Sequence, residues 1–428
     1  MLSLVFSAVT GLVGAAALAA TLSLLVLLTA AASARRRPTP ISAPTLLLAV
    51  VVPAHNEEAV LVSTLKSLNA QSYPAECVEI VVVADNCTDS TAAIARRLGA
   101  TVLERTHASE RGKGYALNHA VSHLLIQPVV ADGFVIIDAD TVAAPDFLQQ
   151  ISAKISQNTD PRGYGAWQGR YGVLNAHDGW RAALMTAAFD LVNHVKPLGR
   201  DTLGLSAGLK GNGMAFTRAL AEVLPWPGGS LTEDLDYGLE LARRFDLRVQ
   251  YVPEARVQAQ MPATAEQAAS QRSRWERGRY GLVRERALPL LGEGLRRRSF
   301  LLLDAAWDLL MPPLAELATL LLLFLGLTLL GTATYLLPHP VFWLSSAGSG
   351  LLGLGVYVFG GLRVAGAGPE AYAALARAPF YALWKFALLF TDWKRSPKSA
   401  DGVTADEWVR TERIPQADAA PTTEIRHL

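Results

Sequence analysis

Two carboxylates one residue apart, Asp138 and Asp140, are the first candidates for chemistry in this sequence. They follow an apolar, mostly β-branched run, residues 134–137, that is bounded by Gly133. Such a run predicts a buried strand of an α/β sheet, where ligands bind at the strand ends. Because alternate side chains of an extended chain point to the same side, both carboxylates can reach one hard cation beside a diphosphate. A strand that simply ends in a polar turn is the alternative, since Asp-x-Asp is common by composition.

Three more charged side chains lie where the pattern predicts strand ends or a glycine loop. Glu57 and Asp85 follow apolar runs, and carboxylates there can accept hydrogen bonds from a base or a ribose. Capping of the next helix is the alternative for each. Lys113 stands between Gly112 and Gly114, so a flexible backbone carries a point cation to where a pyrophosphate would lie. These positions fit a nucleotide-diphosphate site.

A second pair of acids, Glu233 and Asp234, follows Thr232 after a loop rich in proline and glycine. The apolar residues that come next predict a helix that starts here, with Thr232 as its cap. A carboxylate in the first turn of a helix is usually a partner of the helix dipole, with a depressed pKa. Taken alone, the residues favour that interpretation.

Gln271, Arg274 and Trp275 lie at positions i, i+3 and i+4 of an arginine-rich helical stretch, residues 263–283. They therefore lie on roughly one face of the helix. A guanidinium there can bind a diphosphate with two hydrogen bonds, and an indole offers a flat apolar face to a sugar ring. A solvated basic helix with one interfacial tryptophan is the alternative, and by themselves the residues favour it.

The elements that must position these residues alternate along the chain. Apolar runs predict strands at residues 46–52, 80–83, 101–104 and 134–137, with helical segments between them. This alternation predicts a doubly wound parallel sheet whose polar clusters lie at the C-terminal ends of the strands. Asn56 is placed to cap the helix that ends near Leu68.

The second half of this region shows weaker patterns. Residues 164–175 alternate as strands do, residues 179–195 predict a helix, and the turn at residues 211–213 precedes a strand that ends at Phe216. A close approach of backbone to a sugar and a plain tight turn explain those glycines equally well.

Long apolar stretches predict contact with a membrane. Residues 1–34 carry no charge and exceed the ~20 residues that span hydrocarbon, which predicts one tilted helix. A secretory signal is the rival, but this stretch lacks a basic start and its apolar run is too long. The arginines at 35–37 should stay in the cytoplasm by the positive-inside rule. Residues 317–337 and 341–362 predict two further spans.

Two other stretches predict helices that lie in the membrane interface. Residues 295–313 place Asp304 and Asp308 on one face beside leucine and tryptophan residues. Residues 370–392 are apolar, but if they spanned the membrane, the basic cluster that follows would lie outside. The net charge of +1 gives no sign of a nucleic-acid partner. Two cysteines, Cys77 and Cys87, fit a reducing compartment.

Six ordered motifs resemble family 2 glycosyltransferases, in particular the membrane-bound, processive branch of cellulose, chitin, hyaluronan and poly-N-acetylglucosamine synthases. The motifs are Pro53-Ala-His-Asn-Glu57, Asp85 in Val-Ala-Asp-Asn, Lys113 in Arg-Gly-Lys-Gly, Asp138-Ala-Asp140, Thr232-Glu-Asp234 and Gln271-Arg-Ser-Arg274-Trp275. They cover roughly residues 46–285. Each is weak alone, and their order makes the set specific.

The resemblance implies a GT-A nucleotide-diphospho-sugar transferase domain, a UDP-sugar donor and bound Mg²⁺ or Mn²⁺. It assigns the nucleotide-sugar to Glu57, Asp85, Lys113 and Asp138, and the metal to Asp138 and Asp140. It assigns the role of general base to Asp234, and contacts with acceptor and diphosphate to Glu233, Gln271, Arg274 and Trp275. Inverting transfer needs one base opposite the leaving group and no covalent intermediate.

The expected organisation is an α/β domain flanked by transmembrane and interfacial helices. Its parts are a transmembrane helix (1–34), a linker (35–44), a cytoplasmic GT-A domain (45–290), an interfacial helix (295–313), two transmembrane helices (314–362), an interfacial helix (370–392), and a gating-like segment with a polar tail (393–428). The chain would be a multi-pass protein of the inner or plasma membrane.

The expected function is metal-dependent, inverting transfer of a sugar to a glycan acceptor that builds a polysaccharide. The alternative acceptor is a membrane lipid, either a glycolipid or a polyprenyl-phosphate-linked acceptor, that receives one sugar. Self-association or a partner for export fits the polymer reading. A nucleotidyltransferase would share Asp138 and Asp140 without needing the helix of Trp275. A non-catalytic partner should have lost an acid, and none is lost.

Overall fold

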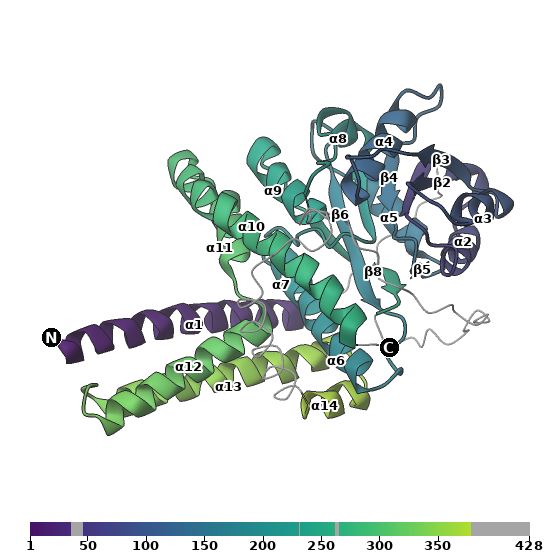
Figure 1. Ribbon diagram of the computed structural model, residues 1–428. Coiled ribbons are helices and arrows are strands. Elements are labelled where there is room, and N and C mark those ends of the chain that lie inside the picture. The colour runs from purple at the N-terminus through teal and green to yellow at the C-terminus, as the bar shows by residue number, and fades with distance from the viewer. Residues whose placement is uncertain (36–45, 231, 262–264, 378–428) are drawn as a thin grey trace.

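The computed structural model describes residues 1–35, 46–230, 232–261 and 265–377, and the side chains of 265–274 are outside this description. An α/β domain lies at one end of a group of long helices (Figure 1). The first helix, α1, comprises Leu2–Ser33. The predicted gating-like segment and most of the stretch 370–392 fall outside the described residues.

The first half of the α/β domain alternates strands and helices as the sequence predicts. Its elements are β1 (Leu48–Ala54), α2 (Leu61–Asn69), the short 3-10 helix η1 (Ala75–Cys77), β2 (Val78–Asp85), α3 (Thr91–Arg97), β3 (Thr101–Arg105), α4 (Lys113–Leu125) and β4 (Gly133–Ile136). These four strands lie in the order β3-β2-β1-β4 and pair in parallel. Their carboxyl ends therefore meet at one edge of the sheet.

The second half corrects the expectation of an all-parallel, doubly wound sheet. Its elements are β5 (Thr141–Ala143), α5 (Phe147–Ser156), β6 (Ala166–Val173), α6 (Trp180–Phe189), the π-helix η2 (Asp190–Val195), α7 (Lys196–Thr202), β7 (Met214–Thr217), α8 (Arg218–Val223), α9 (Glu233–Phe245) and β8 (Gln250–Ala259). The full order is β3-β2-β1-β4-β7-β6-β8-β5.

This half of the sheet is mixed. Strand β7 runs antiparallel to β4 and β6, β5 runs antiparallel to β8, and β6 pairs with β8 in parallel. Alternation of apolar and polar residues reports which face of a strand is buried and carries no information on the direction of its neighbour. The expectation of parallel pairing was therefore wrong for the pairs that involve β7 and β5, and it holds for β6 with β8.

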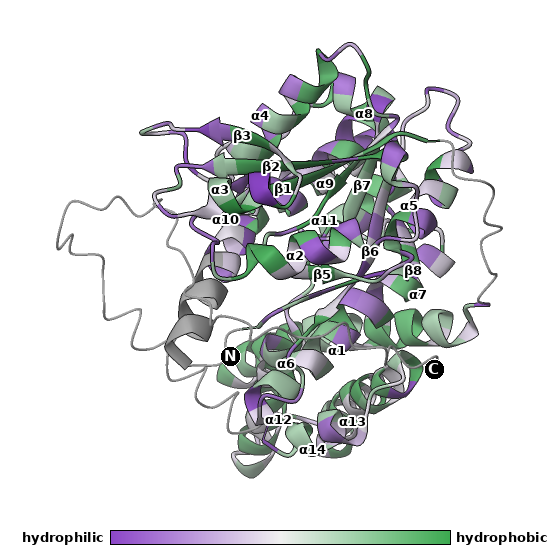
Figure 2. Cartoon of the chain, turned by 90° about the vertical axis from the view of Figure 1, so that its right-hand side faces the viewer, coloured by the Kyte–Doolittle hydropathy of each residue, from purple (hydrophilic) through white to green (hydrophobic). Residues whose placement is uncertain are grey.

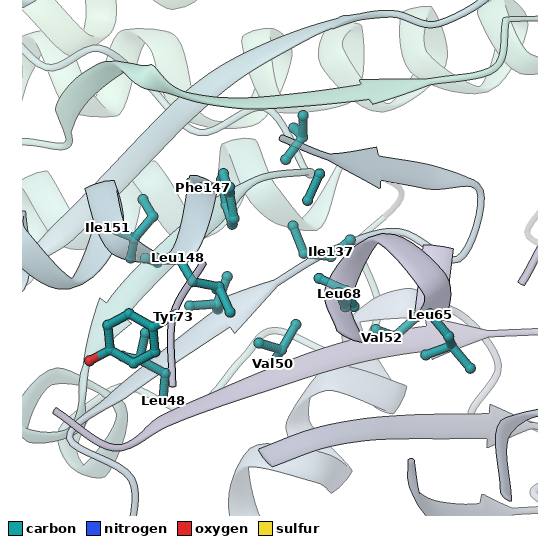
Figure 3. Close-up of a cluster of buried hydrophobic side chains, with 14 of the residues drawn as sticks. Leu48, Val50, Val52, Leu65, Leu68, Tyr73, Ile137, Phe147, Leu148 and Ile151 are labelled. Atoms are coloured by element: carbon teal, nitrogen blue, oxygen red, sulfur yellow. The ribbon is translucent and has the colours of Figure 1, made fainter. Parts of the chain in front are cut away.

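Helices cover both faces of the sheet, which explains the continuous apolar runs of its central strands. On one face Val50 and Val52 of β1 pack with Leu65 of α2 and Phe147 of α5 (Figure 3). On the other face the intervening Val51 packs against α4, α8 and α9 in a second apolar cluster. Because both faces of β1 are packed, the polar residues that follow this strand start from a fixed position in the domain.

Among the described residues, three helices are long and apolar enough to cross a membrane, by length and composition: α1, α12 (Leu314–Ala333) and α13 (Pro340–Ala365). They lie side by side, and Figure 2 shows them largely in the hydrophobic colour. The structure thus has helices at the three stretches for which the sequence predicts spans. Residues 369–375 form the short α14 (Pro369–Leu375).

Helix α10 (Ala265–Arg297) continues well beyond the expected end of the catalytic domain at residue 290. It is followed by α11 (Phe300–Leu310), which packs on α9 and α10 through Leu302, Ala306 and Leu309. The Asp304 and Asp308 carboxylates of α11 form ion pairs with α7 of the α/β domain. The stretch expected to lie in the interface is therefore also a docking element of the domain.

Candidate active site

The loops after β1 and β2 are tied to each other. Asn56 and Asn86 follow the two strands, and both adopt positive φ angles of 55° and 52° that asparagine tolerates better than most residues. The Asn56 side-chain oxygen accepts a hydrogen bond from the Thr88 backbone N–H at 2.7 Å. Helix α2 begins only at Leu61, without a side-chain cap. The prediction that Asn56 caps α2 was wrong, because its side chain joins two loops instead.

Glu57 lies in this loop pair, where its backbone N–H donates to the Thr91 hydroxyl at 2.8 Å. Its side chain is half-buried beside the carboxyl ends of β1 and β2. The structure thus places Glu57 at the sheet edge that the sequence predicts.

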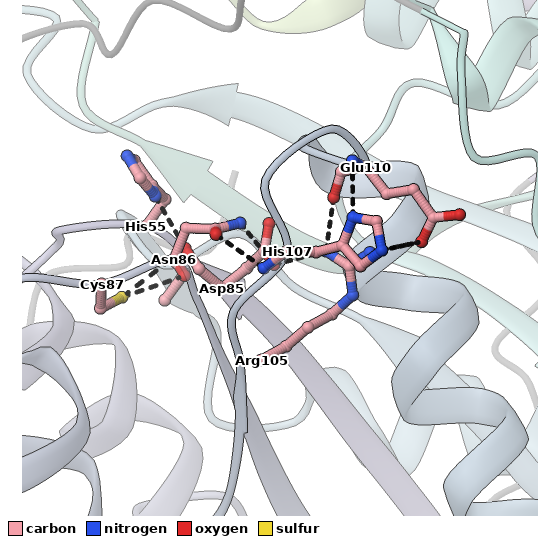
Figure 4. A network of polar contacts seen from close by, with 8 residues as sticks. His55, Asp85, Asn86, Cys87, Arg105, His107 and Glu110 are labelled. Carbon is pink, nitrogen blue, oxygen red and sulfur yellow. Dashed lines mark hydrogen bonds and ion pairs between the residues drawn. The ribbon is translucent and has the colours of Figure 1, made fainter.

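Asp85 ends β2 and is 5% exposed. Its Oδ1 accepts hydrogen bonds from Arg105 Nη1 at 2.8 Å and from the Asn86 amide at 3.1 Å (Figure 4). Arg105, at the end of β3, also lies over the Tyr115 ring. Sequence reasoning missed Arg105, although an arginine that ends the neighbouring parallel strand was a signal that could have found it. The pair fixes Asp85 at the edge of the expected nucleotide site.

The turn that carries Asp138 and Asp140 is anchored to α2. The Thr64 hydroxyl donates to the Ala139 carbonyl at 2.7 Å and accepts from the Thr141 backbone N–H at 3.1 Å. Thr64 is fully buried, so this bridge is shielded from water. The two carboxylates thus emerge from a rigid turn at the end of β4.

Lys113 begins α4 and reaches across to this turn. Its ammonium donates to Asp138 Oδ1 and to the Gly211 carbonyl, each at 2.5 Å, and lies 3.9 Å from Glu233 Oε1. Although burial lowers the pKa of Lys113, the Asp138 and Glu233 carboxylates raise it above its usual value. The side chain is therefore a fixed cation.

Two glycines allow α4 to approach the loop before α9. A Cβ on Gly114 would lie 2.1 Å from the Pro227 carbonyl oxygen, and one on Gly228 would lie 2.2 Å from the Tyr115 ring. Neither position has room for a side chain. This close contact brings Lys113, at the start of α4, beside the acids at the start of α9.

Glu233 and Asp234 are in the first turn of α9, as predicted. Thr232 precedes the helix, but its side chain makes no capping hydrogen bond, so that part of the prediction was wrong. Burial, aided by the Asp234 carboxylate, raises the pKa of Glu233 to about 7 although Lys113 opposes it. Burial also raises the pKa of Asp234. A simple partner of the helix dipole would have had its pKa depressed.

Gly211 lies next to both Asp234 and Lys113. Its φ of +78° favours glycine, and a Cβ there would lie 3.4 Å from Asp234 Oδ2 and 3.6 Å from Lys113 Nζ. We call Lys113, Asp138, Glu233 and Asp234 the carboxylate cluster. The structure thus brings together four of the residues that the sequence assigns to the site.

A buried pair of amides holds residues 208–213, which we call the glycine loop, in place. Asn212 accepts from the Asp138 backbone N–H at 3.2 Å and donates to the Thr141 hydroxyl at 2.7 Å. Gln168 of β6 donates to the Asn212 carbonyl at 2.8 Å and accepts from the Lys210 backbone N–H at 2.8 Å. Both amides are fully buried. Sequence reasoning missed Gln168, because nothing local distinguishes it from other polar residues of a strand.

Trp275 lies on α10, and its side chain is 37% exposed. The side chains of Gln271 and Arg274 lie outside the described part of the structure. The predicted contacts of these three residues with acceptor and diphosphate therefore stay predictions.

The family model described as "Glycosyltransferase like family 2" matches residues 44–278, more than half of the chain. The chain belongs to glycosyltransferase family 2. Its α/β domain is accordingly a GT-A-like glycosyltransferase fold with a mixed sheet. The chain is an enzyme of this family, and its membership in the branch of polymer synthases is not established by this match.

Two curated relatives and one solved structure are similar to this glycosyltransferase. It is 30% identical over 240 residues to a beta-monoglucosyldiacylglycerol synthase from Nostoc sp., covering 54% of this chain and 49% of that one. It is 30% identical over 176 residues to a 4,4'-diaponeurosporenoate glycosyltransferase from Staphylococcus haemolyticus, covering 40% of this chain and 43% of that one. The chain spans about half the length of the curated relatives it matches.

The solved structure is a mannosyltransferase from Pyrobaculum calidifontis in complex with GDP-mannose and Mn²⁺. The two chains are 21% identical with a TM-score of 0.48, over 83% of this chain and 99% of that one.

The donor set at the end of β4 fits a divalent metal in a family 2 glycosyltransferase. The described residues contain no group of three or more acidic, histidine or cysteine side chains that could hold an ion by themselves. Mg²⁺ is usually bound through one or two carboxylates together with substrate phosphates, and Mn²⁺ also prefers oxygen ligands. Asp138 and Asp140 are a pair of this kind, so an ion that binds together with the diphosphate suits them.

Proposed function

We propose that this glycosyltransferase moves a sugar from a UDP-sugar to a lipid acceptor at the membrane surface, with inversion at the transferred carbon. The names of the two curated relatives support a lipid acceptor, since one concerns a glucosyldiacylglycerol and the other a carotenoid acid. Polysaccharide synthesis, which the sequence alone favoured, has less support. The three candidate spans of the part that the structure describes also provide little wall for a glycan channel.

The observation that carries the proposal is the short path from Asp234 to a candidate span. Helix α7 precedes, along the chain, the glycine loop that contacts Asp234. Helix α7 packs directly on α1, where a Cβ on Gly199 would lie 2.2 Å from the Leu27 carbonyl oxygen. An acceptor held in a bilayer around α1 would thus meet the active site from this side.

The chemistry assigned to the chain's own groups is a single displacement. Asp234 removes the proton from the acceptor hydroxyl as that oxygen attacks the sugar carbon. The raised pKa of Asp234 suits a base that must accept a proton near neutral pH. Lys113 orients the departing diphosphate, Asp138 contacts the nucleotide, and Glu57 and Asp85 bind the uridine. A divalent ion held by Asp138 and Asp140 would supply charge stabilisation to the leaving UDP.

The proposed setting is the inner or plasma membrane, with the catalytic domain on the cytoplasmic side. The support is the arginine cluster at 35–37 after α1, which the positive-inside rule places in the cytoplasm. A reporter fused within the catalytic domain would have to be labelled from the cytoplasm.

The test measures where the sugar goes. The purified full chain is given each of a panel of UDP-sugars, Mn²⁺ and detergent micelles that contain membrane lipids. UDP release identifies the donor, and extraction into organic solvent followed by mass spectrometry identifies the product. We expect a lipid that carries one sugar. Water-soluble chains that lengthen with the supply of donor would overturn the lipid proposal in favour of a polymer.

A further inference from the structure

Lys210 lies in the glycine loop, next to Gly211, and is absent from every motif recognised in the sequence. Its backbone is fixed by the hydrogen bond to buried Gln168. Its half-buried side chain folds back over Gly208, whose missing Cβ would lie 3.9 Å from the ammonium. Among the described residues, no hydrogen bond or ion pair reaches that ammonium. A held but unpartnered cation next to the active site therefore needs an explanation.

The charged groups that act on Lys210 come from three elements. They are Lys196 and Arg200 of α7, Asp308 of α11, and Asp234 of α9. Burial and the α7 cations lower the pKa of Lys210 to about 8, against the two carboxylates. At pH 7 the side chain is still mostly charged.

The carboxylates of α11 are already matched by α7. Arg200 pairs with Asp304 at 2.5 Å and with Asp308 at 3.1 Å, and Lys196 pairs with Asp308 at 2.6 Å. We call Lys196, Arg200, Lys210, Asp304 and Asp308 the junction cluster. It holds three cations and two carboxylates, so its own acids leave the Lys210 charge unmatched, and the further acid that acts on Lys210 is Asp234 of the carboxylate cluster. A half-buried cation without a hydrogen bond or ion pair is costly unless a partner arrives.

The junction cluster lies where the catalytic domain meets a candidate span. Helix α7 packs on α1 at Gly199, and Trp307 of α11 donates to the Ser23 hydroxyl of α1 at 3.2 Å. The donor side of the site already has its own cation, Lys113, which is engaged by Asp138. Lys210 is therefore placed for a group that approaches from the membrane side.

We propose that Lys210 binds an oxyanion, a phosphate or a carboxylate, on the lipid acceptor. The inference rests on the proposed lipid acceptor and narrows it to an anionic one. An anionic headgroup would neutralise the excess cation of the junction cluster and hold the attacking oxygen beside Asp234. A neutral acceptor such as a diacylglycerol would leave the cation without a partner.

The experiment compares acceptors of different charge in neutral detergent micelles, which removes the surface charge of a bilayer as a variable. The acceptors are dioleoylglycerol, dioleoylphosphatidylglycerol and 2-hydroxyoleic acid, each of which carries a free hydroxyl. The enzymes are the wild type, Lys210→Met, Lys210→Arg and the control Lys66→Met, which replaces an exposed lysine of α2. The KM for acceptor, the KM for UDP-sugar and the rate of UDP release without acceptor are measured for each.

We expect the wild type to prefer one of the two anionic lipids over dioleoylglycerol. Which of the two it prefers tells whether the bound oxyanion is a phosphate or a carboxylate. Lys210→Met should raise the KM for that lipid about 10- to 100-fold, the range of a charge-assisted hydrogen bond. The KM for UDP-sugar and acceptor-free UDP release should stay unchanged. Lys210→Arg should retain most of the affinity, and Lys66→Met should equal the wild type.

Each other outcome has a defined meaning. If the wild type glycosylates dioleoylglycerol as readily as the anionic lipids, the inference fails while the proposed lipid function stands. If no lipid receives sugar, both fail. Equal effects of Lys210→Met on all acceptors, or on the donor alone, also overturn it. Should Lys210→Met not fold, the acceptor preference of the wild type and Lys210→Arg still decide.

Discussion

Two ionic clusters of similar size lie on either side of the glycine loop, and their charges are unbalanced in opposite directions. The carboxylate cluster has one cation, Lys113, for three acids. The junction cluster has three cations for two acids. Within the first, side chains are 12% to 29% exposed at Lys113, Asp138 and Glu233. In the second, Arg200 and Asp304 are only 4% and 7% exposed, while Lys196 and Asp308 at its margin are 16% and 22% exposed.

This difference suggests that the carboxylate cluster serves the reaction and that the junction cluster stabilises the fold. The surplus acids of the carboxylate cluster are only partly buried and can take up a metal ion or a proton, and burial raises the pKa of Glu233 and of Asp234. The buried pair of Arg200 and Asp304 in the junction cluster cannot exchange partners without leaving a charge in the interior. Only Lys210, at its edge, is free to meet a ligand. The comparison predicts that substitutions in the first cluster cost activity and those in the second cost stability.

The largest expected effect follows from removing a metal-binding acid. Asp138→Asn or Asp140→Asn should reduce transfer below detection, because several kcal/mol of charge stabilisation at the leaving UDP would be lost. Stability should change by no more than about 1 kcal/mol, since the pair with Lys113 is partly exposed. Transfer is measured with and without EDTA. Full activity of either variant in saturating EDTA would contradict the metal site.

The second effect concerns Asp234. Asp234→Asn should lower turnover by about 10²- to 10⁴-fold, the range for loss of a general base, with the fold intact. The matched control is Asp236→Asn, in the same helical turn but directed to Arg286 at 3.5 Å. The helix-dipole reading makes both variants lose about 0.3 to 1 kcal/mol of stability and little rate. An Asp234→Asn enzyme as fast as the control would support that reading.

The third effect tests the junction cluster. Arg200→Met should destabilise the protein by about 3–5 kcal/mol, because it leaves the Asp304 carboxylate buried without its partner. The double variant Arg200→Met with Asp304→Leu should recover most of that loss. Denaturation in detergent measures the stability, and the rate per folded molecule should change little. A loss of rate without a loss of stability would erase the contrast between the two clusters.

The sequence predicts the carboxylate cluster far better than the junction cluster. Asp138 and Lys113 are recognisable because a local pattern, an apolar run or a glycine pair, places each at a loop where ligands bind. Asp304 and Arg200 are 104 positions apart, and only the packing of α11 against α7 brings them together. The spacing of Asp304 and Asp308 showed that they share a face, and it did not show what that face meets.

Prediction of the fold from the sequence has the same limit. The four parallel strands were predictable because alternating strands and helices imply crossover connections. The antiparallel pairing of β7 with β4 was not, since it depends on how the chain returns after α7. Asn56 and Thr232 are residue types that commonly cap helices. The Asn56 side chain instead bonds to the neighbouring loop, and the Thr232 side chain makes no capping hydrogen bond. Local propensity is overridden where long-range contacts satisfy the same groups.

The last and smallest effect is the dependence on pH. Burial raises the pKa of Glu233 to about 7, and burial also raises the pKa of the neighbouring Asp234. Because the base must be ionised to accept a proton, kcat/KM should rise with pH while the Asp234 carboxyl loses its proton, and then level. Stability should move the other way. A carboxyl whose folded pKa is raised adds stability that is complete below its unfolded value near 4.5 and is lost as pH rises through about 7. The melting temperature should therefore fall between pH 5 and pH 8 while activity grows, and Glu233→Gln should flatten that fall. If activity and melting temperature rise together over this range, or if Glu233→Gln leaves the slope of stability unchanged, the surplus acids are not what titrates.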